Sequence, residues 1–459
     1  MTFVLYDLIF LGLFVLFISV FLYKRRHNLK REGLLYLYRT KLGIQFIEWT
    51  TGRYNLLLKK MQYPIIISGY LLMFFGLWMI LKVAYFYITS PGIAKALKVP
   101  IIMPLVPYLP ELFKIDFLPP FYFTYWIVII AIIAIPHEFA HGIFARLNKI
   151  RILSTGFGFL GPFLAAFVEQ DDKQMQKAKK FSQLSVLAAG TFANVLMTLL
   201  FGLILLVFFT ACFSPAGLNF NMYSVGSVNL SSISSIGSDY LGNSSLVRID
   251  ANNKSYFADP KLLNESFASK EESTFVFDDS PAIRAQLSGA IAEIGNNKIR
   301  GYQDLNTTLL SYKPGDNVLI KTIDSKNNVK EYNITFADKG GRAFLGVGLL
   351  PQTRTGAFSF LYNWLAKIKD PFVYYQSNLG DFGVFIYDLL WWIVIINLSV
   401  ALMNMLPLGI FDGGRFFYIS FWALTRSEKA GKWAYKISTW FLLSLIAIML
   451  LKWVSVFAF

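Results

Sequence analysis

The sequence predicts a multi-pass α-helical membrane protein with an inserted, β-rich extracytoplasmic domain. Its composition gives the first indication, because 55% of the residues are hydrophobic and only 15% are charged. An ordinary soluble domain is less apolar and more charged. Apolar runs long enough to cross a bilayer also recur along the chain, whereas residues 214–354 are polar and alternate as strands do. We therefore expect about six transmembrane helices around one external insertion.

The formal net charge is +15, which raises the question of what the basic residues bind. Its basic residues cluster beside apolar runs, where they fix orientation and meet anionic lipid. The expected partner is therefore the lipid bilayer and not a nucleic acid. The single cysteine, Cys212, excludes a disulfide within the chain and a zinc site built from cysteines.

The N-terminal region, residues 1–120, predicts two spans. Residues 2–23 form the first, and the basic, amphipathic stretch that follows it is cytoplasmic by the positive-inside rule. The N-terminus then lies outside, and the second span, 65–88, runs outward. Residues 89–120 hold seven prolines, so they cannot form a regular spanning helix and are expected at the outer surface.

The third span, 121–146, carries the sequence His-Glu-Phe-Ala-His at 137–141. Two histidines four residues apart project from one face of a helix, which allows both to grip one zinc ion, while Glu138 can act on the metal-bound water. This pattern also occurs on ordinary helices. Here it would place ionisable groups at membrane depth, at a cost of roughly 2.5–3.5 kcal/mol each, which favours a metal site. The span runs inward and reaches His137 after about 16 residues, or roughly 24 Å of helix, so the site is expected in the cytoplasmic half.

Two further elements complete the first half of the predicted core, residues 121–213. Residues 156–168 are apolar but too short and too rich in glycine to span, so we interpret them as a re-entrant hairpin or loop beside the metal; an amphipathic surface loop is the alternative. Residues 182–209 form the fourth span, which runs outward. It carries Asn194, either a contact between helices or a catalytic group.

The second half of the predicted core, residues 355–459, follows the external domain of residues 214–354. A fifth span runs inward to about residue 406, and a final span covers 438–457. Between them, Asp412 precedes two glycines that allow a sharp turn. An Asp-Gly turn at a helix end explains this residue in many proteins. Its depth matches that of His137 and His141, however, so we predict it as a ligand.

These motifs together resemble the site-2 protease family of intramembrane zinc metalloproteases. The resemblance rests on His-Glu-Phe-Ala-His in one span and on Asn404-x-x-Pro407-x-x-x-x-Asp412-Gly413 in a later one. It implies that His137, His141 and Asp412 hold one Zn²⁺ per chain and that Glu138 is the general base. It also implies that Asn194, in the motif Gly190-x-x-x-Asn194, and Asn404 lie near the scissile carbonyl.

Within the external domain, residues 275–336 resemble a PDZ domain through Ser280-Pro281-Ala282, Asp304-Leu305 and Lys313-Pro314-Gly315-Asp316. Strands are predicted at 274–277 and 317–321, where apolar and polar residues alternate. A PDZ domain can accept a peptide ligand by strand addition. A plain spacer that limits access to the membrane site is the alternative.

The predicted function is cleavage of membrane-anchored protein substrates near the cytoplasmic face by a zinc endopeptidase. A prokaryotic cell membrane is the expected location, with the N-terminus and residues 214–385 outside. Two alternatives stay open. One is a non-catalytic scaffold with a vestigial metal site. The other is a zinc protease of the prenyl-protein type, whose third ligand is a glutamate.

Overall fold

The computed structural model describes residues 3–33, 35–89, 104–115, 118–160, 163–241, 246–324, 327–350 and 359–458. The chain forms two compact units, Met1–Val207 with Phe385–Phe459 and, between these segments, Phe208–Val384.

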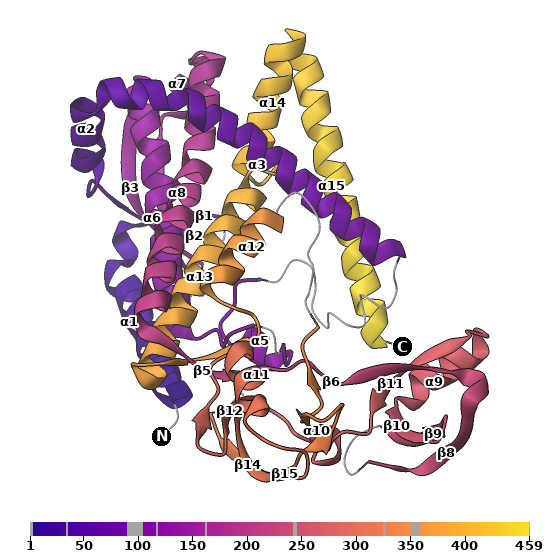
Figure 1. The fold of residues 1–459 in the computed structure, drawn as a ribbon. Helices are drawn as coiled ribbons and strands as arrows, with labels where there is room; N and C mark the ends of the chain where they lie inside the picture. The colour runs from indigo at the N-terminus through magenta and orange to yellow at the C-terminus, as the bar shows by residue number, and fades with distance from the viewer. Residues whose placement is uncertain are drawn as a thin grey trace. The chain divides into compact units, whose positions relative to one another are not determined.

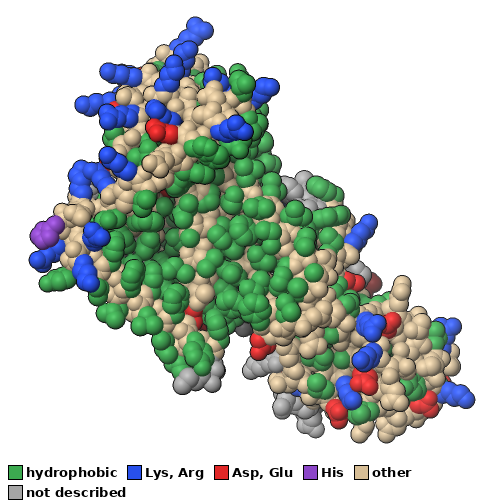
Figure 2. All heavy atoms as spheres, turned by 90° about the vertical axis from the view of Figure 1, so that its left-hand side faces the viewer, with side chains coloured by type: hydrophobic (Ala, Val, Ile, Leu, Met, Phe, Trp, Pro, Cys, Tyr) green, Lys and Arg blue, Asp and Glu red, His purple; other side chains and the backbone are tan. Residues whose placement is uncertain are grey.

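Six long helices dominate the first unit (Figure 1). Among the described residues these are the helices long and apolar enough to cross a membrane, so the predicted number of spans is confirmed. Their bounds are α1 (Phe3–Arg25), α3 (Asn55–Thr89), α6 (Phe123–Leu147), α8 (Lys180–Cys212), α13 (Gly380–Asn404) and α15 (Glu428–Ala458). Figure 2 shows a broad hydrophobic surface, with lysine and arginine side chains gathered above it.

The long helices differ from the predicted spans mainly at their ends. Helix α3 begins at Asn55, ten residues before the predicted span of 65–88, and its first two turns carry Lys59 and Lys60. Helix α6 has 25 residues, or about 37 Å at 1.5 Å per residue, which exceeds the thickness of a bilayer core. Shorter helices accompany them: η1 (Arg26–Asn28), α2 (Ile44–Arg53), α5 (Leu109–Leu112), α7 (Asp172–Lys177) and α14 (Asp412–Thr425).

The predicted outer segment, 89–120, is described in part. Residues 90–103, 116 and 117 lie outside the described residues. In the described stretch 104–115 the only helix is the four-residue α5, in agreement with the prediction that the prolines prevent a spanning helix.

A buried carboxylate on α1 caps the start of α6. Asp7 is 2% exposed and accepts hydrogen bonds from the main-chain N–H groups of Phe123 at 2.7 Å and Thr124 at 2.9 Å. The hydroxyl group of Tyr108 also donates to Asp7. Burial and this hydrogen bond raise the pKa of Tyr108, which keeps it a protonated donor. Since the first N–H groups of a helix have no partner within it, Asp7 satisfies them from another helix.

A four-stranded sheet lies against α6 in the order β1-β2-β3-β4. The predicted element at 156–168 is a β-hairpin; its entry into the membrane stays a prediction. The sequence did not predict β1 and β2, which extend this hairpin from a segment interpreted as a basic loop. The strands are β1 (Leu29–Glu32), β2 (Leu35–Thr40), β3 (Ile152–Leu160) and β4 (Phe163–Gln170).

The second unit contains two main sheets (Figure 1). Their strand orders are β7-β11-β10-β9-β8 and β15-β14-β12-β5-β19, with β13 paired to β12. The elements are β5 (Phe213–Leu218), β6 (Met222–Tyr223), β7 (Val225–Asn229), η2 (Leu230–Ser232), β8 (Ile233–Tyr240), β9 (Val247–Ala251), β10 (Lys254–Ala258), α9 (Pro260–Ala268), β11 (Ser273–Asp278), α10 (Pro281–Arg284), β12 (Ala290–Ile294), β13 (Asn297–Lys298), α11 (Tyr302–Leu310), β14 (Asn317–Ile323), β15 (Val329–Thr335), β16 (Ala337–Asp338), β17 (Ala343–Phe344), β18 (Val347–Gly348), α12 (Ser359–Ile368) and β19 (Val373–Ser377).

Both strands that the alternation predicted in this unit are present, as β11 and β14. They belong to different sheets, because β11 pairs with β7 and β10 whereas β14 pairs with β12 and β15. The stretch that resembles a PDZ domain, 275–336, therefore begins in one sheet and continues in the other. The PDZ resemblance stays a prediction.

Candidate metal centre

Helix α6 places the two motif histidines on one face, as their spacing requires. The Nε2 atoms of His137 and His141 lie 3.1 Å apart. His137 is buried at 7% exposure, in the middle of a helix whose other residues are mostly apolar.

Asp412, the first residue of α14, meets these histidines from a distant part of the chain. Its Oδ2 atom lies 3.4 Å from Nε2 of His137 and 3.2 Å from Nε2 of His141. Among the described residues, these three form the only group of histidine, cysteine and acidic side chains close enough to hold a metal ion. The structure thus brings together the three residues that the sequence nominated as ligands.

The separations of these donor atoms can be tested against zinc. Tetrahedral zinc with bonds of about 2.0–2.1 Å sets its ligand atoms roughly 3.3 Å from one another. The three observed separations are 3.1, 3.2 and 3.4 Å. Two imidazoles and one carboxylate also form a donor set that leaves a fourth position for water. The residues therefore fit a tetrahedral ion such as zinc.

Gly413 and Gly414 allow Asp412 to reach the histidines, but for a different reason from the one predicted. The sequence suggested glycines for a sharp turn, yet neither has a positive φ. The requirement is space. A Cβ on Gly413 would lie 2.3 Å from the main-chain carbonyl of Met405, and one on Gly414 would lie 2.4 Å from the carbonyl oxygen of Leu408. Glycine thus permits α14 to begin directly against the preceding segment.

One face of α8 packs onto the histidines through three residues spaced by four, Val186, Gly190 and Asn194. The carbonyl oxygen of Val186 lies 2.7 Å from Nδ1 of His141. The amide Nδ2 of Asn194 lies 3.2 Å from Nδ1 of His137. The second nitrogen of each histidine therefore has a partner on α8, which fixes how each ring is turned.

Gly190 lies between these two contacts and leaves room for both rings. A Cβ at this position would come within 2.4 Å of Nε2 of His141 and 2.7 Å of Nε2 of His137. The sequence analysis identified Gly190 only as part of a family motif, and the structure adds this steric reason. The Val186 carbonyl was missed, because a main-chain acceptor leaves no signature in the residue type.

The remaining motif residues lie as follows. Glu138 accepts a hydrogen bond from the main-chain N–H of Val168 on β4, at 3.1 Å. Asn404 is the last residue of α13, and within the described part of the chain its side chain makes no hydrogen bond. A role for Asn404 beside a substrate carbonyl stays a prediction.

A family model described as Peptidase family M50 matches residues 125–445, from the start of α6 through the hairpin, α8 and Asp412 into α15. The chain belongs to Peptidase family M50. The resemblance to the site-2 protease family is thereby confirmed. M50 membership indicates a metallopeptidase, and together with the six apolar helices it identifies an integral membrane protein. Among curated proteins, no relative matches the chain.

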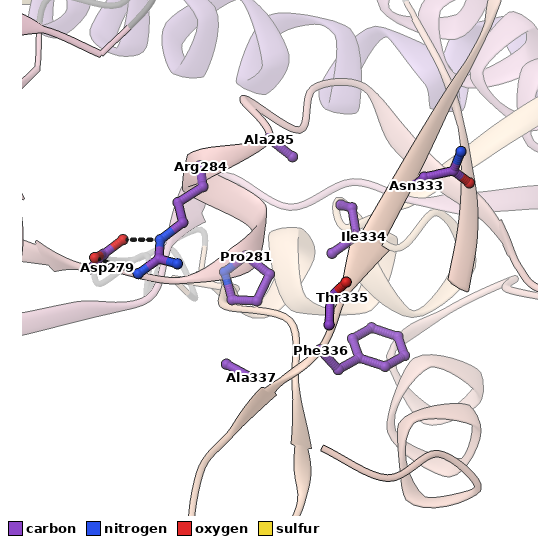
Figure 3. Close-up of a pocket in the computed structure, with 9 residues that line it drawn as sticks. All are labelled: Asp279, Pro281, Arg284, Ala285, Asn333, Ile334, Thr335, Phe336 and Ala337. Atoms are coloured by element: carbon purple, nitrogen blue, oxygen red, sulfur yellow. Dashed lines mark hydrogen bonds and ion pairs between the residues drawn. The ribbon is translucent and has the colours of Figure 1, made fainter. Parts of the chain in front are cut away.

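The second unit of this M50 protein holds cavities of its own. One of about 500 Å³ lies between α10 and β15 and is shown in Figure 3. Arg284 lines it but points to Asp279, with Nε 2.5 Å from Oδ1 and a terminal nitrogen 2.7 Å from Oδ2. Apart from Arg284 and Asp279, the residues that line it are uncharged. This cavity therefore suits binding better than acid–base chemistry.

Proposed function

We propose that this M50 protein is an intramembrane zinc endopeptidase that cleaves membrane-anchored proteins near the cytoplasmic face. The observation that carries the proposal is the convergence of His137, His141 and Asp412 at the spacing of tetrahedral ligands. Glu138 lies beside them, on the helix that carries the two histidines. One Zn²⁺ per chain is expected.

Each residue has a distinct role in this proposal. His141 offers the lone pair of Nε2, because its Nδ1–H can donate to the carbonyl of Val186. His137 does the same when the amide of Asn194 is turned so that its oxygen accepts the Nδ1–H. Asp412 adds one anionic oxygen. When bound, zinc acts as a Lewis acid and lowers the pKa of a coordinated water toward about 7. Glu138 takes the proton of the attacking water and returns it to the leaving amine.

The hairpin of β3 and β4 offers a strand with which an unwound substrate could pair. A helical substrate hides its carbonyl groups in hydrogen bonds within the helix, so cleavage requires local unwinding. Strand β4 ends the sheet order β1-β2-β3-β4 and lies against α6. We propose that the unwound segment pairs with the outer edge of β4, which would replace the hydrogen bonds that the substrate loses.

The second unit is proposed to hold an extended peptide by strand addition. Strand β15 ends its sheet, and the N–H and C=O of Phe336 bond toward Asp316 and Gly315 on the β14 side. Alternation then turns the main-chain groups of Thr335 and Asn333 outward, toward the cavity in Figure 3. Thr335→Pro should remove one outward donor and abolish capture of peptides selected on the wild type; undiminished capture would argue for a plain spacer.

The proposed orientation places the N-terminus and residues 214–385 outside and the metal site in the cytoplasmic half of a prokaryotic cell membrane. The basic segment after α1 supports it, through the positive-inside rule. Labelling of His27→Cys in a Cys212→Ala background by an impermeant thiol reagent should occur only from the cytoplasmic side. Labelling from outside intact cells would invert the topology.

Metal analysis of purified protein tests the enzyme proposal before any substrate is known. We expect about one zinc per wild-type chain, and a large loss in both His137→Ala and Asp412→Ala. Retention of zinc by Asp412→Ala would favour a third ligand elsewhere, as in the prenyl-protein type. A folded wild type without zinc would favour the scaffold.

Cleavage is then tested on a panel of single-span reporter proteins. Glu138→Ala should keep its zinc and its fold but lose cleavage, because the proton acceptor is gone. Cleavage that persists in this variant would exclude the proposed mechanism.

A further inference from the structure

Strand β4 supplies a main-chain donor to the glutamate of the metal motif. The N–H of Val168 points to Oε2 of Glu138, with 3.1 Å between nitrogen and oxygen. The two residues come from different elements, β4 and α6. A main-chain donor cannot rotate away as a side chain can, so it sets the direction of the carboxylate more rigidly.

The pairing of the hairpin indicates that this donor belongs to the outer edge of the sheet. In an antiparallel pair, opposed residues alternate between hydrogen-bonded and non-bonded pairs. Because the N–H of Val168 points to Glu138, its pair with Thr155 is non-bonded, and Ala166 and Leu164 also face outward. By the same alternation, the N–H groups of Ala166 and Leu164 point away from β3, toward the outer edge of the sheet.

The close approach of β4 to α6 depends on the residue that follows the second histidine. A Cβ on Gly142 would lie 3.0 Å from Cγ1 of Val168 and 2.8 Å from Cδ1 of Ile47. Glycine at this position therefore lets β4 lie near enough for its main chain to reach Glu138. Helix α6 thus carries both Glu138 and the glycine, Gly142, that leaves room for the donor of Glu138 to approach.

We propose that Val168 is a positioning residue whose main-chain N–H aims the Glu138 carboxylate at the attacking water. The inference rests on the proposed function, in which Glu138 takes the proton. A carboxylate held by a fixed donor is already oriented. It therefore loses less rotational freedom on reaching the transition state than a carboxylate that is free to rotate. The N–H of Val168 is already bonded to Glu138. A substrate strand that pairs with β4 would therefore bond to the main-chain groups of Ala166 and Leu164, and its end would lie beside Glu138.

Amide hydrogen exchange tests the contact without any need for activity. In Glu138→Ala, exchange at the Val168 amide should accelerate by about tenfold or more, since the acceptor is lost. The Phe167 amide is the matched control, because it faces β3 and should exchange at the wild-type rate. Unchanged exchange at Val168 would overturn the proposal, whether or not the chain cleaves a substrate.

A second measurement replaces the amide N–H of residue 168 by an ester oxygen, which removes the donor and keeps the side chain. We expect kcat to fall by about tenfold to a hundredfold, with KM changed by less than about threefold and zinc per chain unchanged. A loss carried by KM, with kcat intact, would mean that the N–H binds substrate and does not position Glu138.

The two measurements separate this inference from the proposed function. A wild type that lacks both zinc and cleavage would refute the proposed function, and with it the role of Val168 in positioning a base. Cleavage by the wild type, together with equal kcat values for the ester variant and the wild type, would refute the inference alone.

Discussion

Asn194 on α8 contacts His137 at Nδ1, the ring nitrogen that does not face His141 and Asp412. The distance from Nδ2 of Asn194 to this nitrogen is 3.2 Å. Asn194 is fully buried, and its Oδ1 has no hydrogen-bond partner. Turning the amide by 180° exchanges these atoms, so that Oδ1 accepts the Nδ1–H of a neutral imidazole. This arrangement leaves the lone pair of Nε2 directed at the metal, and it satisfies the oxygen.

Asn194→Leu should therefore weaken zinc binding by about tenfold to a hundredfold, the usual effect of losing a partner behind a metal ligand. The measurement is zinc affinity by competition with a chelator. Asn397→Leu is the matched control, because Asn397 is also a fully buried asparagine but bonds within α13, to the carbonyl of Ile393. Equal losses in the two variants would show a general effect of removing a buried amide.

Gly190→Ala should abolish zinc binding, because the added methyl group would overlap the Nε2 atoms of both histidines. Zinc per purified chain measures the effect. Gly202→Ala, on the same helix, is the control: a Cβ there meets no atom within 4 Å, so zinc content should match the wild type. Zinc bound normally by Gly190→Ala would contradict the packing of α8 against the site.

Removal of the metal should stop cleavage but leave the helices intact. The helices are held by apolar clusters such as Phe144, Ala188 and Met405, which include none of the three ligands. Treatment with 1,10-phenanthroline should therefore abolish turnover while the helical circular dichroism stays unchanged, and added zinc should restore turnover. A loss of helical signal on chelation would instead make the metal a structural one.

The sequence predicted the parts of the site that have a local pattern. His137 and His141 follow from helical spacing, and Asp412 follows from the depth of its segment and the family motif. What it could not predict are contacts between main chain and side chain of distant elements, such as the Val186 carbonyl on His141. Their geometry depends on how helices pack, and any residue type can supply a carbonyl or an N–H.

The same distinction explains the fold. Long apolar runs alone define the six helices, with errors only at their ends. The strands β1 and β2 were missed because Leu29–Glu32 is mostly charged and suggested a solvated loop. Their pairing with the distant hairpin strand β3 gives these residues strand structure. Tertiary contacts here override local composition.

Asp7→Leu should destabilise the protein while sparing zinc binding. It would leave the buried N–H groups of Phe123 and Thr124 without an acceptor, at about 1–3 kcal/mol each. The midpoint of thermal unfolding should therefore fall by several degrees, and zinc per folded chain should remain near the wild-type value. Tyr108→Phe removes one donor but keeps the cap, so its loss should be smaller. An unchanged midpoint in Asp7→Leu would mean that α6 begins correctly without this cap.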